Sequence, residues 1–171
     1  DKNKVREKIE NRIYADLEAG RVGGAQVCVK QDGEVIYENC FGFSDNGKEL
    51  APNTIFRLAS MTKPITGVAI MKQINRGLVS LNDPIDKFIP EYEEMNIGAL
   101  DADRNIVITG KAKEKMRVLH LLTHSSGIEC GEVGGKINSS IPKGTMVDLK
   151  SATETYAKYP LSFDPYTSQA Y

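Results

Sequence analysis

Apolar residues recur at every fourth position near the start of the chain, with charged residues between them. The stripe consists of Val5, Ile9, Ile13 and Leu17. Residues four apart share one face of a helix, so this pattern predicts an amphipathic helix over residues 2–19. Gly20 follows directly and is typical of a helix stop.

The pattern then changes to short β-type segments around a tight turn. Residues 25–30 and 35–41 are rich in Val, Ile, Tyr and Phe, and they flank Asp32-Gly33. An Asp-Gly pair between two such segments predicts a β-hairpin with a two-residue turn.

A third apolar pattern follows at residues 60–76 and predicts a helix. Pro64 is tolerated only in the first turn of a helix, so the helix begins near Ser60, and Gly77 ends it. We expect its apolar side to pack on the core. That side consists of Ile65, Val68, Ala69 and Ile74.

The remaining segments are shorter. We expect a loop at 42–55, a helical turn at 83–90, a short strand at 105–109, a helix at 117–123, a surface loop at 127–144 and a helix at 148–158.

Composition narrows the function classes. The chain has 171 residues, enough for one domain, and a net charge of -1. This balance gives no electrostatic reason to expect nucleic acid or an anionic membrane as a partner. The apolar runs are too short to cross a bilayer. None of these features assigns a compartment.

Three cysteines make an odd number. With a two-residue turn, Cys28 faces Tyr37, and Cys40 lies on the other side of the sheet. We therefore predict that Cys28, Cys40 and Cys130 are free thiols and mostly buried. No Cys-x-x-Cys pair indicates a metal site.

The pair Ser60 and Lys63 is the candidate for chemistry, because residues three apart share one helix face. A serine hydroxyl becomes a nucleophile when a base takes its proton. A lysine serves as that base when desolvation and a helix dipole lower its pKa. The alternative is that Ser60 caps the helix and Lys63 is solvated.

A second pair, His120 and His124, has the i, i+4 spacing of zinc ligands on a helix. No Glu stands beside His120 and no third ligand is evident, so we expect no metal site. The Gly-x-Ser-x-Gly elbow of α/β-hydrolases is absent from the sequence.

Several runs together resemble one family. Ser-x-x-Lys at 60–63 is the arrangement of class A β-lactamases and penicillin-binding proteins. The run 118–128 is similar to "His-Leu-Leu-Thr-His-Thr-Ser-Gly", 77–85 to "Gly-x-Leu-x-Leu-Asp-Asp-Pro", and 163–171 to "Phe-x-Pro-Gly-Thr-x-x-x-Tyr-Ser". The chain thus resembles the serine β-lactamase and penicillin-binding-protein superfamily, in particular the branch of class C β-lactamases, D-alanyl-D-alanine carboxypeptidases and related esterases.

The resemblance implies a role for each candidate residue. Ser60 would be the nucleophile, Lys63 the general base, and Tyr171 would share the acid/base work. Without that context, Tyr171 is an ordinary buried tyrosine. Tyr166 stands where the family usually has glycine, so the turn before Tyr171 is expected to differ. The segment from His120 to His124 is expected to brace the active-site helix. No cofactor is implied.

The implied fold is α/β, with an antiparallel sheet flanked by helices and a mostly helical region. Residues 1–171 would be the N-terminal portion of one β-lactamase-like domain. Residues 1–55 would supply a helix and a hairpin of the sheet region, and 56–171 the mostly helical region. The family's closing strands, with a Lys-Thr-Gly or His-x-Gly motif, do not occur in this sequence. We therefore expect a C-terminal half of the same protein as partner, either a continuation or a second chain.

The implied function is a serine hydrolase that forms an acyl-enzyme. Its substrate would be a small molecule or short peptide: a β-lactam, a D-amino-acid peptide or an ester. The motifs do not choose among these. A penicillin-binding sensor without turnover, or an inactive homologue, remains as the alternative.

Overall fold

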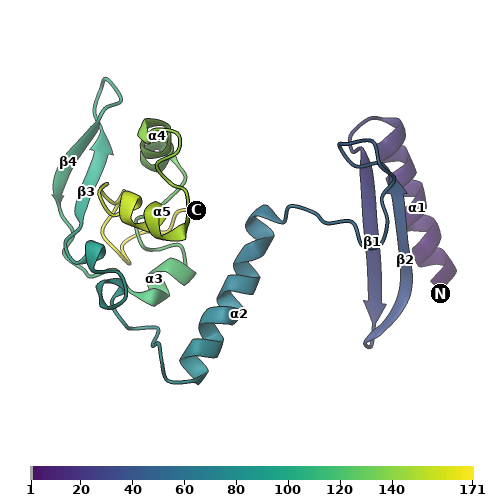
Figure 1. The fold of residues 1–171 in the computed structure, drawn as a ribbon, viewed down its shortest axis with the longest axis horizontal. Helices are drawn as coiled ribbons and strands as arrows, with labels where there is room; N and C mark the ends of the chain where they lie inside the picture. Colours follow the sequence, from purple (N-terminus) through teal and green to yellow (C-terminus); the bar gives the residue numbers. More distant parts are fainter. Residues whose placement is uncertain (1) are drawn as a thin grey trace. The chain divides into compact units, whose positions relative to one another are not determined.

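The computed structural model describes residues 2–171 and divides the chain into two compact units. One unit ends at Ala59, and the other spans Ser60–Tyr171 (Figure 1). The fold is α/β, with helices and two antiparallel two-stranded sheets among the described residues, as the resemblance predicts.

The first unit confirms the predicted helix and hairpin. Helix α1 spans Lys2–Glu18, strand β1 Gly24–Gln31 and strand β2 Glu34–Gly42. Helix α1 lies along the hairpin and contacts β2 (Figure 1). The predicted apolar stripe of α1 is half-buried there. Gly20 has φ +65°, the left-handed conformation that ends a helix.

The predicted register of the hairpin is wrong by one residue beyond the turn. Cys28 pairs with Glu38, and Cys40 pairs with Gln26, because a β-bulge between Val29 and Lys30 shifts the pairing. Opposed residues point to the same side, so Cys28 and Cys40 share a face. Both are free, as predicted, but Cys28 and Cys130 are exposed rather than buried.

Helix α2 begins where Pro64 requires. A short 3₁₀ turn at Ala59–Met61 leads into α2 at Thr62–Asn75, and Gly77 follows with φ +71°. The predicted packing of its apolar side is wrong for this chain, since Ile65 and Val68 are 60% and 62% exposed. Ile70, at a different angle on the helix, packs against the core instead.

The rest of the second unit surrounds a small core. After α2 come 3₁₀ turns at Ile85–Lys87 and Pro90–Tyr92, β3 Asn96–Leu100, β4 Ile106–Lys111, α3 Val118–Leu122, α4 Glu132–Ser140 and α5 Leu149–Tyr156. Strands β3 and β4 form an antiparallel pair. The predicted strand at 105–109 is thus confirmed as part of β4, while β3 was not predicted.

The core consists of Ile85, Tyr92, Met95, Met116, Val118 and Leu161. Burial raises the pKa of Tyr92 to about 12, so its phenol stays neutral. Leu161 also hydrogen-bonds to β3, since it accepts from the Gly98 N–H and donates to the Asn96 carbonyl, each at 2.8 Å. The segment after Leu161 therefore leaves the core from a fixed point.

The predicted surface loop at 127–144 is wrong, because helix α4 occupies its middle. Ile137 on α4 is buried, and the helix contacts both β3 and β4. Gly134 and Gly135 lower helix propensity and obscured the pattern. Gly134 is required, because a Cβ there would lie 1.7 Å from the Glu129 carbonyl oxygen.

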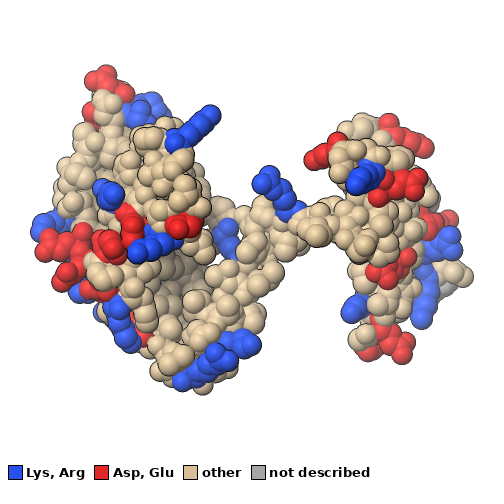
Figure 2. Space-filling view, viewed as in Figure 1, with Lys and Arg blue, Asp and Glu red and all other residues tan. Residues whose placement is uncertain are grey.

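On the face shown in Figure 2, basic and acidic side chains are interspersed over both units. No helix within residues 2–171 combines the length and the apolar character needed to span a membrane.

Candidate active site

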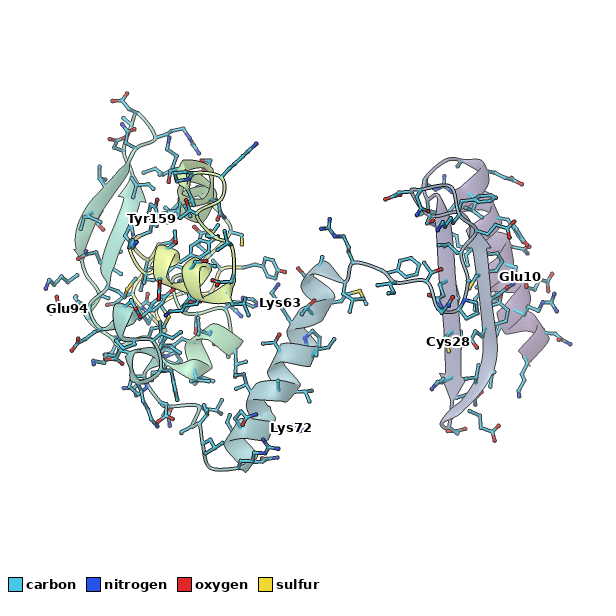
Figure 3. The ribbon with its side chains drawn as sticks, in the orientation of Figure 1. Glu10, Cys28, Lys63, Lys72, Glu94 and Tyr159 are labelled. Atoms are coloured by element: carbon cyan, nitrogen blue, oxygen red, sulfur yellow. The ribbon has the colours of Figure 1, made fainter. Side chains whose placement is uncertain are left out.

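Ser60 and Lys63 meet at the start of α2. Lys63 Nζ donates a hydrogen bond to Ser60 Oγ at 3.2 Å. Lys63 projects from the first turns of α2 toward the rest of its unit (Figure 3). Ala59, directly before the serine, has φ +46°, a conformation that is costly for a residue with a Cβ. The chain thus turns sharply into the helix at the candidate nucleophile.

Tyr171 completes a triangle of hydrogen bonds with these two residues. Lys63 Nζ donates to Tyr171 OH at 2.6 Å, and Ser60 Oγ and Tyr171 OH form a short hydrogen bond. The hydrogen bond from Lys63, and then that with Ser60, holds the pKa of the Tyr171 phenol below its usual value. The structure therefore brings together all three predicted site residues, although Tyr171 lies 108 positions from Lys63.

Tyr171 is placed by a loop, residues 123–130, that no sequence motif relates to it. The loop 123–130 hydrogen-bonds to segment 161–171 through four backbone contacts: Gly127 O to Ser162 N, Ser125 O to Tyr166 N, His124 O to Ala170 N, and Cys130 N to Tyr171 O at 2.7 Å. Segment 161–171 is thus held in register along its length. The carbonyl of Tyr171 itself is one of the fixed points.

The hydrogen bonds around the segment from His120 to His124 run to two other segments. Its neighbouring N–H groups, at Val118 and Leu119, donate to Asp83 and Leu81 in the loop after α2. The region is thus linked to the loop that follows α2, and Ile70 of α2 packs against the core that contains Val118. That the segment braces α2 stays a prediction. On its other side, the Thr123 and His124 carbonyls accept hydrogen bonds from Gln169 Nε2 and the Ala170 N–H, so the region also holds the segment that carries Tyr171.

The two histidines have different surroundings, and neither is arranged as a metal ligand. His120 is buried, its Nδ1 accepts the Arg117 N–H at 3.1 Å, and burial lowers its pKa. His124 lies beside Tyr171, with ring centroids 5.0 Å apart. Within residues 2–171, no group of three or more His, Cys, Asp or Glu side chains is placed to hold a metal ion.

Tyr166 adopts the backbone conformation that glycine would. Its φ is +73°, in the left-handed region, so the turn before Tyr171 keeps this shape without a glycine. The Tyr166 ring lies over that of His120, with centroids 5.8 Å apart. The turn therefore has the left-handed backbone that suits a glycine. It differs from a turn with glycine in carrying a large side chain and in the strain that this side chain brings.

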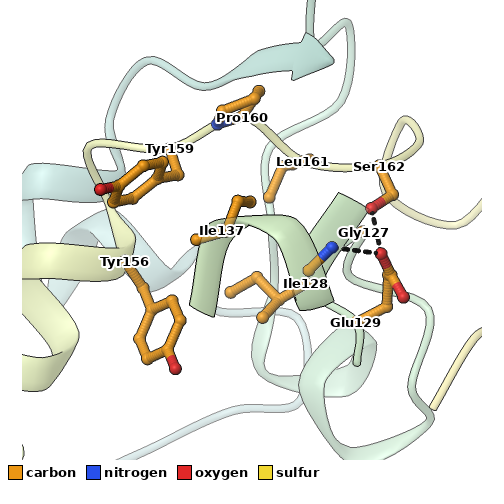
Figure 4. Close-up of a pocket in the computed structure, with 10 residues that line it drawn as sticks. Gly127, Ile128, Glu129, Ile137, Tyr156, Tyr159, Pro160, Leu161 and Ser162 are labelled. Atoms are coloured by element: carbon orange, nitrogen blue, oxygen red, sulfur yellow. Dashed lines mark hydrogen bonds between the residues drawn. The ribbon is translucent and has the colours of Figure 1, made fainter. Parts of the chain in front are cut away.

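The half-buried carboxylate of Glu129 holds the end of the same loop. Glu129 Oε1 accepts hydrogen bonds from Gly134 N and Ser162 Oγ, both at 2.8 Å (Figure 4). These contacts tie the start of α4 to the segment that leads to Tyr171. Leu161 and Ile137 line the small pocket beside it. The sequence offered no signal for this anchor, because its partners come from separate segments.

Comparison with known proteins places the chain in a family. The family model described as Beta-lactamase matches residues 9–171. The chain belongs to this family. It is 28% identical over 158 residues to the esterase EstB of Burkholderia gladioli, a match that covers 87% of this chain and 37% of that protein.

Solved structures share the fold. EstCE1, described as a hydrolase with promiscuous acyltransferase activity, superposes with a TM-score of 0.77 at 22% identity, over 99% of this chain and 44% of its own. The octameric penicillin-binding protein homologue of Pyrococcus abyssi superposes with a TM-score of 0.64 at 27% identity, over 96% of this chain and 35% of its own. The chain thus spans about 40% of the length of these relatives.

Proposed function

We propose that this chain carries the nucleophile and proton-transfer groups of a serine hydrolase that works through an acyl-enzyme. The observation that carries this proposal is the closed hydrogen-bond triangle of Ser60, Lys63 and Tyr171. A nucleophile needs a base within hydrogen-bond reach, and the triangle supplies two candidate proton acceptors. A serine that only capped the helix would not need hydrogen bonds to both Lys63 and Tyr171.

In the proposed reaction, Ser60 Oγ attacks the carbonyl carbon of the substrate and its proton leaves to the Lys63–Tyr171 pair. Lys63 acts as general base, and Tyr171 as acid/base partner. The tetrahedral intermediate collapses when the leaving nitrogen or oxygen takes that proton. Water then attacks the acyl-serine with the same groups, which releases the acid and restores Ser60.

The lowered pKa of Tyr171 supports its part in this scheme. When Lys63 is charged, its ammonium donates to the phenol oxygen and stabilises a phenolate. That phenolate can accept the Ser60 proton through the direct hydrogen bond between the two hydroxyls. The backbone N–H of Ser60, at the start of the helix, is one donor for the oxyanion.

The substrate class that we propose is a small acyl compound: an ester, a β-lactam or a D-amino-acid peptide. EstB is named an esterase, and EstCE1 a hydrolase with acyltransferase activity, which supports ester hydrolysis as the first activity to assay. A penicillin-binding sensor or an inactive homologue would share the same family and the same fold.

We also propose that a C-terminal part of the same protein completes the site, as a continuation or a second chain. The apolar side of α2 is exposed at Ile65 and Val68, and the hairpin is a two-stranded sheet with both edges unpaired among the described residues. Both features require cover in a stable protein. The length of the relatives leaves room for that cover.

The test is to incubate the complete protein with a chromogenic ester, a chromogenic cephalosporin and a D-alanyl peptide, beside a Ser60→Ala control. Continued product release that depends on Ser60 supports the hydrolase. One equivalent of product with a stable adduct identifies a sensor instead. Neither product nor adduct from any substrate would contradict the proposal and leave the inactive homologue.

A further inference from the structure

The geometry points to His124 as a positioning residue for Tyr171, an inference that rests on the proposed function. The imidazole would keep the phenol oriented so that its oxygen reaches Ser60 and Lys63 at once. The family resemblance implies no more for His124 than a place in a structural segment that braces a helix.

The first support is the ring contact. The His124 and Tyr171 rings lie with centroids 5.0 Å apart and planes inclined by 43°, within the range of favourable aromatic contacts. Lys63 Nζ lies 4.5 Å from the centroid of the same phenol ring. Tyr171 is nevertheless 57% exposed, so few other groups of this chain restrict its rotation.

The second support is the backbone of His124. It adopts φ +56°, and its carbonyl accepts the Ala170 N–H at 3.0 Å. The preceding carbonyl, of Thr123, accepts from Gln169 Nε2 at 2.8 Å. The residues directly before Tyr171 are thus fixed to the residues that carry the imidazole. These hydrogen bonds therefore fix the backbone that carries each ring, and so keep the two rings in contact.

The consequence is geometric. The backbone contacts fix where the Tyr171 Cα lies, but its phenol oxygen is several bonds away and can rotate out of the triangle. A ring packed against the phenol limits that rotation. Because the phenol oxygen must contact both Ser60 Oγ and Lys63 Nζ, a small rotation would lengthen one or both hydrogen bonds.

Two substitutions separate the imidazole ring from the backbone conformation. Asn tolerates a left-handed φ, so His124→Asn removes the ring and keeps the loop. Phe retains an aromatic ring but is strained at that φ, so His124→Phe does the reverse. A positioning role and a purely structural role therefore predict opposite orders for the two variants.

The experiment measures steady-state hydrolysis of an activated ester by the complete protein, which gives kcat and KM, with thermal unfolding in parallel. We expect His124→Asn to lower kcat about 10-fold to 100-fold with KM nearly unchanged and the unfolding temperature preserved. His124→Phe is expected to keep most of kcat and to lower the unfolding temperature. If Asn keeps the parent's kcat, or if kcat falls only where stability falls, the inference is overturned.

A second readout does not depend on turnover. Tyr171 is titrated by ultraviolet difference absorbance against Tyr171→Phe; the titratable groups around it are Lys63, His124 and Cys130. In His124→Asn we expect its pKa to rise toward the ordinary tyrosine value, because the hydrogen bond from Lys63 loosens. An unchanged pKa overturns the inference.

The rates also separate this inference from the proposed function. If the parent reacts at Ser60 while the Asn variant reacts equally fast, only the positioning role fails. If the parent's Ser60 does not react, the proposed function fails.

Discussion

The two segments that meet at the candidate site are held by the chain in very different ways. Segment 161–171 starts from the buried Leu161 and carries backbone hydrogen bonds to the loop 123–130 up to Tyr171. Helix α2 has no fully buried residue and exposes its apolar side. The part of the site that carries Tyr171 is thus fixed by this chain, whereas the part that carries Ser60 and Lys63 needs further cover.

The largest effect is expected at the residue that joins the two segments. Lys63→Ala should lower the acylation rate by about 10²–10⁴-fold, because it removes both hydrogen bonds from Nζ. Stopped-flow acylation with an activated ester measures this. Lys72→Ala, on the last turn of the same helix, is the matched control and should leave the rate unchanged. A Lys63→Ala rate within a few-fold of the parent would show that Lys63 is not the base.

A somewhat smaller loss of acylation rate is expected from a substitution at Tyr171, on the segment that this chain holds firmly. Tyr171→Phe should lower acylation about 10²-fold, since it keeps the ring and removes the hydroxyl from the triangle. In the parent, the rate should rise with pH through the lowered pKa of Tyr171, because loss of a proton from the Lys63–Tyr171 pair makes a proton acceptor available to Ser60. Tyr171→Phe should lack this rise. Tyr166→Phe is the control in the same segment, and equal losses from both variants would argue against a specific role.

A substitution on the exposed side of α2 sharpens the comparison. If the rest of the protein covers this side, Val68→Asp should destabilise the complete protein by about 2–3 kcal/mol, because it buries an unpaired charge. Thr66→Asp, at a polar position two residues earlier, should change stability by less than about 0.5 kcal/mol. Urea unfolding measures both. Equal, small changes in stability from both variants would mean that this side of α2 stays exposed in the complete protein.

The smallest effect concerns the anchor behind the Tyr171 segment. Gly134→Ala should destabilise by about 1–3 kcal/mol, because its Cβ would collide with the Glu129 backbone. Gly135→Ala is the matched control, since nothing lies within 4 Å of a Cβ there and alanine favours helix. It should stabilise by about 0.5–1 kcal/mol. Thermal unfolding compares them, and the reverse order would contradict the anchor.

Local patterns predicted the elements that depend on local physics. The four-residue stripe gave α1, Asp32-Gly33 gave the hairpin, and Pro64 fixed the start of α2. The register beyond the turn was missed because a bulge leaves no mark in an apolar pattern. Helix α4 was missed because Gly134 lowers helix propensity. A glycine is needed there because the Glu129 backbone lies too close for a Cβ, and the apolar periodicity gives no sign of this contact.

The candidate site divides in the same manner. Spacing alone joined Ser60 to Lys63, since both lie on one helix turn. Tyr171 came only from resemblance, because no local rule relates residues so far apart in sequence. The hydrogen bonds that place Tyr171 run from the Ala170 N–H to the His124 carbonyl and from the Cys130 N–H to the Tyr171 carbonyl. They were not predictable, since they depend on how two irregular segments pair.

The central claim is that Ser60 is the nucleophile, and covalent labelling tests it most directly. The complete protein is treated with a fluorophosphonate and a fluorescent penicillin, digested, and the labelled peptide is sequenced by mass spectrometry. We predict one adduct, on Ser60, that is lost in Ser60→Ala. Ser125 and Ser126, which are buried and hydrogen-bonded in the loop 123–130, should stay unmodified. An adduct on either of them, with Ser60 free, would contradict the account.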